Sequence, residues 1–138
     1  MTYEEKKAWL WRYRDAQKLL EQLCNRLEEA RTAARHTTQN FSLTPSGNGD
    51  GQSLARAVER TDDLEHQVTF QLAECDALYE EIDEALQQLE DFWKYHILKD
   101  YYLEGKTWEQ IAHDTNYSLS MIYVLRRKAM EHYSRTGN

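Results

Sequence analysis

Hydroxyl-bearing and basic side chains between residues 106 and 128 occur at spacings that suit contact with duplex DNA. Ser and Tyr hydroxyls can donate or accept hydrogen bonds at base edges, while Arg and Lys side chains pair with phosphates. On a helix that begins near residue 118, Ser120, Tyr123 and Arg127 would share the outward face. The expected DNA-contacting residues are Lys106, Ser118, Leu119, Ser120, Tyr123, Val124, Arg126, Arg127 and Lys128.

Two short helices joined by a tight turn would position these side chains. Thr107 stands where an N-cap belongs, and Gln110 three residues later completes a capping box. The pattern predicts a first helix over Trp108–Asp114 and a second helix that is capped by Ser118 or Ser120. This order of elements is that of a helix-turn-helix, which binds the major groove of DNA.

The spacing of apolar residues fits the same motif. If Ala112 packs against the second helix, a turn residue is expected four positions later, and Asn116 tolerates the left-handed backbone of such a turn. Buried apolar residues are expected ten and thirteen positions after Ala112, where Ile122 and Leu125 stand. Thr115 departs from the pattern, since an aliphatic residue is commoner there. Similar helix pairs also occur in all-α proteins that do not bind DNA, and the basic run that ends the second helix favours DNA.

The distribution of charge supports this interpretation although the chain of 138 residues carries a net charge of −7. Residues 1–91 hold 10 Lys and Arg against 19 Asp and Glu, a balance of −9, and residues 92–138 hold 7 against 5, a balance of +2. A DNA-binding surface depends on the local field rather than on the total. The modest positive balance of residues 92–138 predicts weak nonspecific binding to DNA.

The sequence offers no pattern typical of an enzyme or a metalloprotein. The acidic run Glu80, Glu81, Asp83 and Glu84 lacks a partner at ligand spacing, and the five histidines form no metal-binding pattern. Cys24 and Cys75 are expected to be small core residues in a reducing compartment. No apolar run has the length of a membrane span. We therefore expect a cytoplasmic protein that has no catalytic residue, metal or cofactor and does not bind a membrane.

Apolar residues over 3–35 predict a long helix with one narrow buried seam. The seam positions alternate between steps of four and three: Trp9, Tyr13, Ala16, Leu20, Leu23, Leu27, Ala30 and Ala34. Residues 37–52 interrupt the pattern with Thr, Asn, Ser, Pro and Gly, so this segment is predicted to be a flexible loop.

A second heptad predicts another long helix after this loop. Its seam positions are Leu54, Val58, Thr61, Glu65, Val68, Leu72, Cys75, Tyr79, Ile82, Leu86, Leu89 and Trp93. The charged residue Glu65 is expected either to pair with Arg26 or another basic residue of the first helix, or to lie where the packing opens. Residues 1–91 thus predict a long antiparallel, coiled-coil-like hairpin that serves oligomerisation or partner binding. Because two helices bury only one seam, a third layer is expected, from a second copy in a homodimer or from the C-terminal helices.

Residues 92–104 form a further amphipathic segment that would support the helix-turn-helix. Either this helix continues the preceding one or Asp91 caps a new start, and Gly105 stands where a helix-terminating glycine belongs. The expected buried residues are Trp93, Ile97, Leu98, Tyr101 and Tyr102. The sequence therefore predicts an all-α chain with a helical hairpin over 1–91 and a DNA-binding domain over 92–138.

The segment from Ile97 to Tyr133 resembles region 4 of the sigma-70 family. The residues that match the family pattern in order are Glu109, Ile111, Ala112, Ile122, Leu125, Lys128, Ala129 and Met130. With the acidic helical N-terminal part, the whole chain resembles phage-encoded late transcriptional regulators of the ArpU/RinA type. The resemblance implies a phage or prophage transcriptional regulator that binds duplex DNA and contacts RNA polymerase.

The chain departs from the sigma family where the recognition helix begins. That family carries charged, promoter-reading residues there, whereas this chain has Leu119, Ser120 and Met121. It also has no stretch resembling sigma region 2, so it is not expected to melt a promoter. Two other functions fit the same elements. One is a DNA-packaging protein of the phage small-terminase type, and the other is a protein that docks on RNA polymerase without reading DNA.

Overall fold

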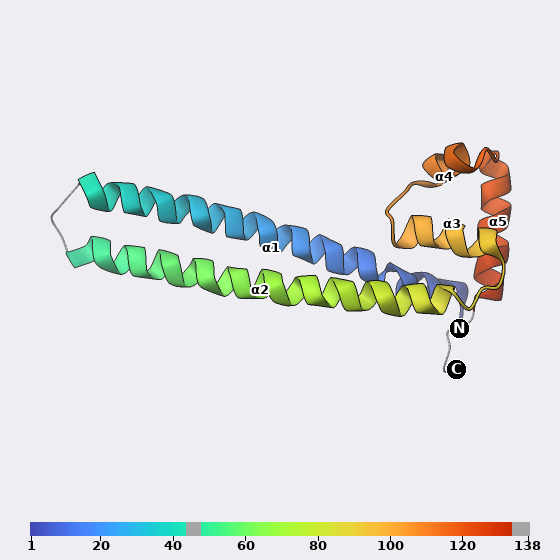
Figure 1. Ribbon diagram of the computed structural model, residues 1–138, viewed down its shortest axis with the longest axis horizontal. Coiled ribbons are helices and arrows are strands. Elements are labelled where there is room, and N and C mark those ends of the chain that lie inside the picture. The colour runs from blue at the N-terminus through green and yellow to red at the C-terminus, as the bar shows by residue number, and fades with distance from the viewer. Residues whose placement is uncertain (44–47, 134–138) are drawn as a thin grey trace. The chain divides into compact units, whose positions relative to one another are not determined.

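The computed structural model describes the backbone of residues 1–43 and 48–133 and the side chains of residues 1–37 and 51–133. These ranges are all-helical, as predicted. The helices are α1 (Tyr3–Leu43), α2 (Asn48–Leu86), α3 (Phe92–Tyr102), α4 (Trp108–Thr115) and α5 (Leu119–His132) (Figure 1). Among the described residues, no helix combines the length and the apolar character that a membrane crossing requires. The chain divides into unit 1, made of Met1–Ala16 and Cys75–Asn138, and unit 2, made of Gln17–Glu74.

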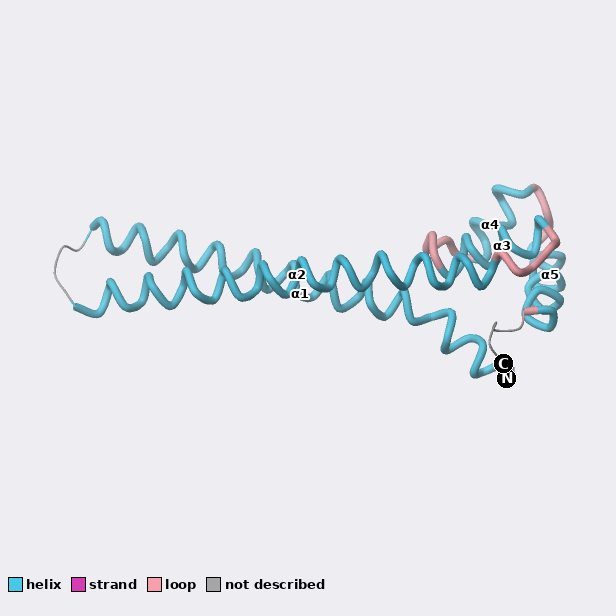
Figure 2. Tube along the Cα trace, turned by 60° about the horizontal axis from the view of Figure 1, so that its bottom comes forward, coloured by secondary structure: helices cyan, strands magenta, loops and turns pink. Residues whose placement is uncertain are grey.

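The larger core of unit 1 joins residues from four helices. Its buried members are Trp9, Leu10, Ile82, Ala85, Leu86, Leu89, Leu98, Tyr102, Leu103, Ala129, Met130 and Tyr133. The rings of Trp9 and Tyr133 lie 6.0 Å apart between centroids. Lys6 Nζ donates a hydrogen bond of 2.7 Å to the carbonyl of Met130, near the end of α5. This core fixes the base of the α3–α4–α5 cluster that Figure 2 shows from a second direction.

Helices α2 and α3 are separate, because α2 ends at Leu86 and Asp91 caps a new helix. The Asp91 carboxylate accepts hydrogen bonds from the backbone N–H of Trp93 at 2.9 Å and of Lys94 at 3.1 Å. The prediction that Trp93 is buried was wrong, since 41% of it is exposed. That prediction extends the heptad of α2 to residue 93, whereas the new helix that begins at Phe92 has a heptad register of its own. Tyr101, also predicted as buried, is half-buried.

A polar network joins the end of α2 to α3 and the turn after it. Tyr95 donates to the Asp83 carboxylate at 2.5 Å, and Lys99 lies 3.2 Å from the Tyr95 hydroxyl and 3.6 Å from Asp83. The hydrogen bond to Tyr95, with further help from the Asp83 charge, raises the pKa of Lys99. Tyr79 donates to the Glu104 carboxylate at 2.6 Å. These bonds fix the orientation of α3 by satisfying half-buried polar groups.

In unit 2, residues 17–43 of α1 and 48–74 of α2 lie side by side in both views (Figures 1 and 2). The buried cluster between them consists of Leu27, Ala30 and Leu64, with Val68 packed against it. The predicted seam of the first helix is confirmed at Leu23, Leu27 and Ala30, which are all buried. A two-helix pair offers only this narrow strip for burial.

The predicted seam of α2 was wrong by one residue at Val58, Glu65 and Leu72, whereas the seam residues Cys75, Ile82 and Leu86 are buried as predicted. Leu64 and Gln71 are buried, whereas Val58 is 49% exposed, Leu72 is 48% exposed and Glu65 lies on the surface. A heptad allows steps of four and three residues in either order. Choosing one order places Val58, Glu65 and Leu72 in the seam together, and choosing the other places the residue before each of them there. Hydrophobicity favours Val58 and Leu72, but the same choice would place the Glu65 carboxylate in an apolar seam, where burial of a charge is costly.

Glu65 therefore pairs at the surface. Its carboxylate lies 3.2 Å from the guanidinium of Arg31, and both side chains are about half exposed, at 47% and 49%. The expectation of a basic partner from the first helix is confirmed, although the partner is Arg31 and not Arg26.

The loop predicted over residues 37–52 was too long at both ends. The backbone is helical up to Leu43 and again from Asn48, and residues 44–47 lie outside the described part of the chain. The reason is that Thr, Asn and Ser reduce helix stability by less than about 0.7 kcal/mol each. Such a composition weakens a helix without ending it.

Candidate nucleic-acid interface

The ends of α4 and α5 are fixed by the caps that the sequence predicts. Thr107 accepts a hydrogen bond from the backbone N–H of Gln110 at 3.1 Å, and the Gln110 side chain accepts one from the N–H of Thr107 at 2.8 Å. Asn116 ends α4 in the left-handed region, with φ of 62°. Ser118 caps α5 by accepting from the N–H of Met121 at 3.1 Å. The predicted capping box, turn residue and Ser118 cap are confirmed.

The inner sides of α3, α4 and α5 enclose a small apolar core. Its buried members are Ile97, Ile111, Ala112 and Ile122, and Leu125 packs against them half-buried. Thr115, the residue that departs from the expected pattern, keeps its hydroxyl satisfied by donating to the carbonyl of Ile111 at 2.8 Å. Because its hydroxyl is hydrogen-bonded, the half-buried threonine can occupy a position where an aliphatic side chain is commoner. This core sets the angle at which α5 leaves the turn.

The outer side of α5 carries the exposed polar residues of the predicted interface. Ser118, Ser120, Arg127 and Lys128 are exposed, and Tyr123 is 38% exposed. Leu119 and Val124 are half-buried, so each offers only part of its side chain to a ligand. No acidic residue stands in the first turn of α5, where the helix dipole favours an anion.

Arg126 differs from its basic neighbours because its guanidinium lies over aromatic rings. The guanidinium carbon is 5.3 Å from the centroid of Trp108 and 4.9 Å from that of Tyr123. Trp108 in turn stacks on Tyr101, with ring centroids 4.0 Å apart. The Nε atom of Arg126 is buried and has no hydrogen-bond partner among the described residues. The side chain thus packs on α4 and supports Tyr123.

Lys106 is held between two carboxylates. Its Nζ atom lies 3.1 Å from Asp114 and 3.9 Å from Asp100. The hydrogen bond to Asp114 and the charge of Asp100 raise the pKa of Lys106. Burial raises the pKa of Asp100 and outweighs the opposing effect of the nearby Lys106 charge. A phosphate would compete with both carboxylates for this ammonium group.

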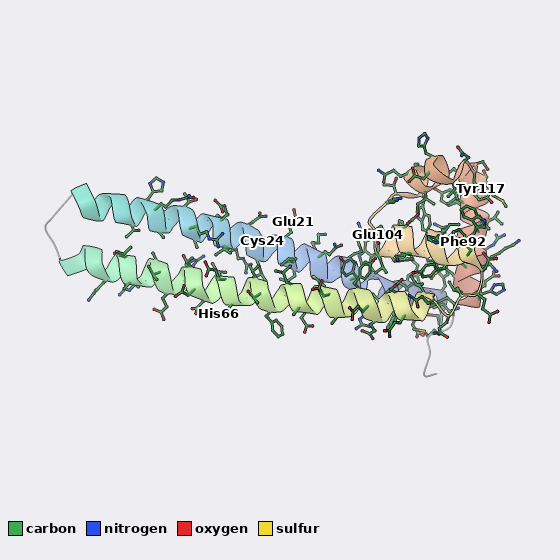
Figure 3. All side chains as sticks on the ribbon, viewed as in Figure 1. Glu21, Cys24, His66, Phe92, Glu104 and Tyr117 are labelled. Atoms are coloured by element: carbon green, nitrogen blue, oxygen red, sulfur yellow. The ribbon has the colours of Figure 1, made fainter. Side chains whose placement is uncertain are left out.

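Aromatic residues beside the turn were not anticipated as part of this surface. The rings of Trp93 and Tyr117 meet edge to face, 5.6 Å apart between centroids. Phe92, which is 63% exposed, and Tyr117 are labelled in Figure 3. Tyr117 lies between the end of α4 and the cap of α5, so it belongs to neither helical pattern. The sequence nevertheless carried a signal for the position of Trp93. Asp91 can cap a new helix, and Trp93 is the second residue of that helix and not a continuation of α2.

Among the described residues, no group of three or more His, Cys, Asp or Glu side chains is placed to hold a metal ion. The exposed polar groups of the predicted interface lie on α5, and the rings of Trp93 and Tyr117 meet beside the turn. Comparison of the chain with protein-family models, with curated proteins and with solved structures finds no match.

Proposed function

We propose that the protein binds duplex DNA through α4 and α5, which form a helix-turn-helix similar to sigma-70 region 4, and acts as a phage-type transcriptional regulator. One observation carries the proposal. The side of α5 that bears Ser120, Tyr123 and Arg127 is exposed, while its opposite side packs into the core through Ile122. A helix with such a free polar side can enter the major groove with its N-terminal half against base edges.

The exposed residues divide into two roles. Ser118, Ser120 and Tyr123 present hydroxyls to base edges, and Leu119 contacts a thymine methyl with the exposed part of its side chain. Arg127 and Lys128 contact phosphates and set the register of the protein on DNA.

The other members of the expected set contribute less to DNA contact. The Arg126 guanidinium is engaged with two rings, the Lys106 ammonium with two carboxylates, and Val124 is half-buried. Their substitution is therefore expected to change DNA affinity less than Arg127→Ala does.

Fluorescence anisotropy with a labelled duplex, titrated across salt concentrations, tests the proposal. Arg127→Ala is expected to weaken binding to most sequences and to lower the salt slope by about one unit, because one phosphate contact is lost. Arg56→Ala, which removes the same charge from an exposed site in unit 2, serves as the matched control and should leave the slope unchanged.

Two results would overturn the assignment. Absence of duplex binding at low salt, with retained binding to RNA polymerase, would select a polymerase-docking protein. A ring of eight or more chains in solution would select a packaging protein of the small-terminase type.

We also propose that the helical hairpin formed by α1 and α2 joins two copies of the chain. Val58 and Leu72 stand two heptads apart on α2, so they share one side, and each is about half exposed. Pairing of two copies along that side would supply the third layer that a two-helix seam lacks. Sedimentation of Val58→Gln/Leu72→Gln tests this pairing, since a dimer should become a monomer while helicity is kept, and a monomeric parent protein would refute it.

A further inference from the structure

A separate concavity lies within unit 1, between the beginning of α1 and the end of α3. It encloses a volume of about 430 Å³, which is within the range of small-molecule and side-chain pockets. Its aromatic lining comes from Trp11, Tyr101 and Tyr102, and its charged lining from Glu4, Lys7 and Asp15. None of these residues belongs to the outer side of α5, so the proposed DNA-binding function does not account for this cleft.

The three aromatic rings form a corner. Trp11 and Tyr102 stand at 86° to one another with centroids 6.1 Å apart, and Tyr101 and Tyr102 stand at 89° with centroids 4.9 Å apart. Tyr101 is held in place from its other side by stacking on Trp108. Ring faces carry partial negative charge, so walls of this kind attract a cation as well as an apolar stem.

Trp11 already accepts one guanidinium. The Arg14 guanidinium carbon lies 4.9 Å from the Trp11 ring centroid, and its Nη1 donates to the carbonyl of Tyr101 at 2.9 Å. Arg14 does not line the cleft. The part of Trp11 that faces the cleft therefore remains open to a second group.

The charges inside the cleft leave one carboxylate unpaired. Lys7 lies 3.8 Å from Glu4 and also above the Tyr3 ring at 5.5 Å, so its charge is balanced. Asp15 is exposed and has neither an ion pair nor a hydrogen bond with any described residue. The cleft thus combines aromatic walls with a free negative charge at one end.

We infer that this cleft binds an arginine side chain of a partner protein, with the alkyl stem against Trp11 and Tyr102 and the guanidinium at Asp15. Arginine suits this arrangement better than lysine, because its planar group stacks on an aromatic face and also donates two parallel hydrogen bonds to one carboxylate. The proposal adds a basic protein partner to a chain whose other proposed partner is DNA.

NMR of the full-length protein tests the inference through the indole N–H signals of its tryptophans. The probe is N-acetyl-arginine amide, and N-acetyl-citrulline amide is the neutral ligand of the same shape. The arginine compound is expected to shift the Trp11 signal in a saturable way, and the citrulline compound should bind at least about fivefold more weakly, since it lacks the charge. Equal affinity for both compounds, or no saturable shift, would overturn the inference.

Two variants with matched controls localise the binding. Asp15→Asn should weaken arginine amide binding about threefold to fivefold, whereas Asp76→Asn, at another exposed aspartate of unit 1, should leave it unchanged. Trp11→Leu, in which the backbone amide signal of Asp15 replaces the lost indole signal as the reporter, should abolish binding. Trp93→Leu, at a similarly exposed tryptophan outside the cleft, should retain it. Unchanged affinity in Asp15→Asn would refute the site. Arg127→Ala should bind the arginine compound normally, so failure of this test is distinguishable from failure of the DNA-binding proposal.

Discussion

The two units of the chain differ most in the side chains from which they are built. All 4 tryptophans and all 9 tyrosines stand in unit 1, and residues 17–74 contain neither. The largest fully buried side chains also belong to unit 1: Leu10, Ile82, Leu86, Ile97, Leu98, Ile111, Ile122, Met130 and Tyr133. Among the side chains of unit 2 that the structure describes, the buried cluster has three members. Unit 1 thus has a core enclosed from several sides, and unit 2 has a strip between two helices.

This difference shows how the number of packed helices determines what must be buried. A helix surrounded by several others can bury apolar residues on a broad face, whereas a helix with one neighbour buries only its seam. In unit 2, Phe70 is 67% exposed and Leu72 is 48% exposed, while the polar Gln71 is buried. The difference is also convenient, because tryptophan fluorescence reports on unit 1 alone and far-ultraviolet circular dichroism reports on all helices.

Truncation of leucine in each unit should give the largest contrast. Leu98→Ala, at a fully buried site of unit 1, is expected to lower the free energy of unfolding by about 2–5 kcal/mol, because it leaves a cavity. Leu19→Ala, at a site of unit 2 where the side chain is 44% exposed, should cost less than about 0.5 kcal/mol. Urea denaturation followed by both signals measures the two values. Equal costs would contradict the difference between the enclosed core of unit 1 and the narrow seam of unit 2.

Removal of a helix cap should have the next largest effect. Thr107→Ala deletes the hydroxyl of the capping box and is expected to cost about 1 kcal/mol. Thr69→Ala is the matched control in unit 2, where the hydroxyl only donates to the Glu65 carbonyl of its own helix. Because alanine favours the helix interior, this control should be neutral or stabilising. Thermal unfolding compares them, and an equal loss in both variants would contradict a specific role for the cap.

These caps also show what the sequence could predict. Thr107, Asn116 and Ser118 act on backbone groups within a few residues, so local sequence was sufficient to place them. The exposed face of α5 could be predicted from the helical spacing of Ser120, Tyr123 and Arg127 alone. Positions that depend on a neighbouring helix were harder to predict. Trp93 was misplaced because the heptad of α2 was extended past Asp91, although Asp91 was also recognised as a possible cap of a new helix.

The sequence predicted which residues of the candidate site lie near α5, but it did not predict what each of their side chains contacts. Arg126 and Lys106 were expected to contact phosphates because of their charge. The contacts that engage them come from Trp108 and from Asp100 and Asp114, which reach them only after the helices have packed. Sequence spacing gives the direction of a side chain on its own helix, and it does not give the partner that meets the side chain there.

A dependence of stability on pH should be smaller and confined to unit 1. The hydrogen bond from Tyr79 to Glu104 raises the pKa of Tyr79 to about 12 from an ordinary value of 10.0. The folded state thus favours the neutral phenol, so this contribution to stability is complete below pH 10 and is lost as the pH rises towards 12. Urea midpoints between pH 9 and 12, followed by circular dichroism, should decline less in Tyr79→Phe than in the parent protein, with Tyr3→Phe as the control. An unchanged decline in Tyr79→Phe would contradict the assignment.

The smallest expected effect distinguishes the two possible seams of α2. If Glu65 lay in the seam, as its heptad position first suggested, Glu65→Leu would replace a buried charge with an apolar group and stabilise unit 2 strongly. On the surface beside Arg31, the same change removes one exposed ion pair, which is worth about 0–1 kcal/mol. Circular dichroism during thermal unfolding is the appropriate measurement, because unit 2 has no tryptophan to observe. A change in the free energy of unfolding of no more than about 1 kcal/mol supports Leu64 as the seam residue, and a gain of several kcal/mol would move the seam to Glu65.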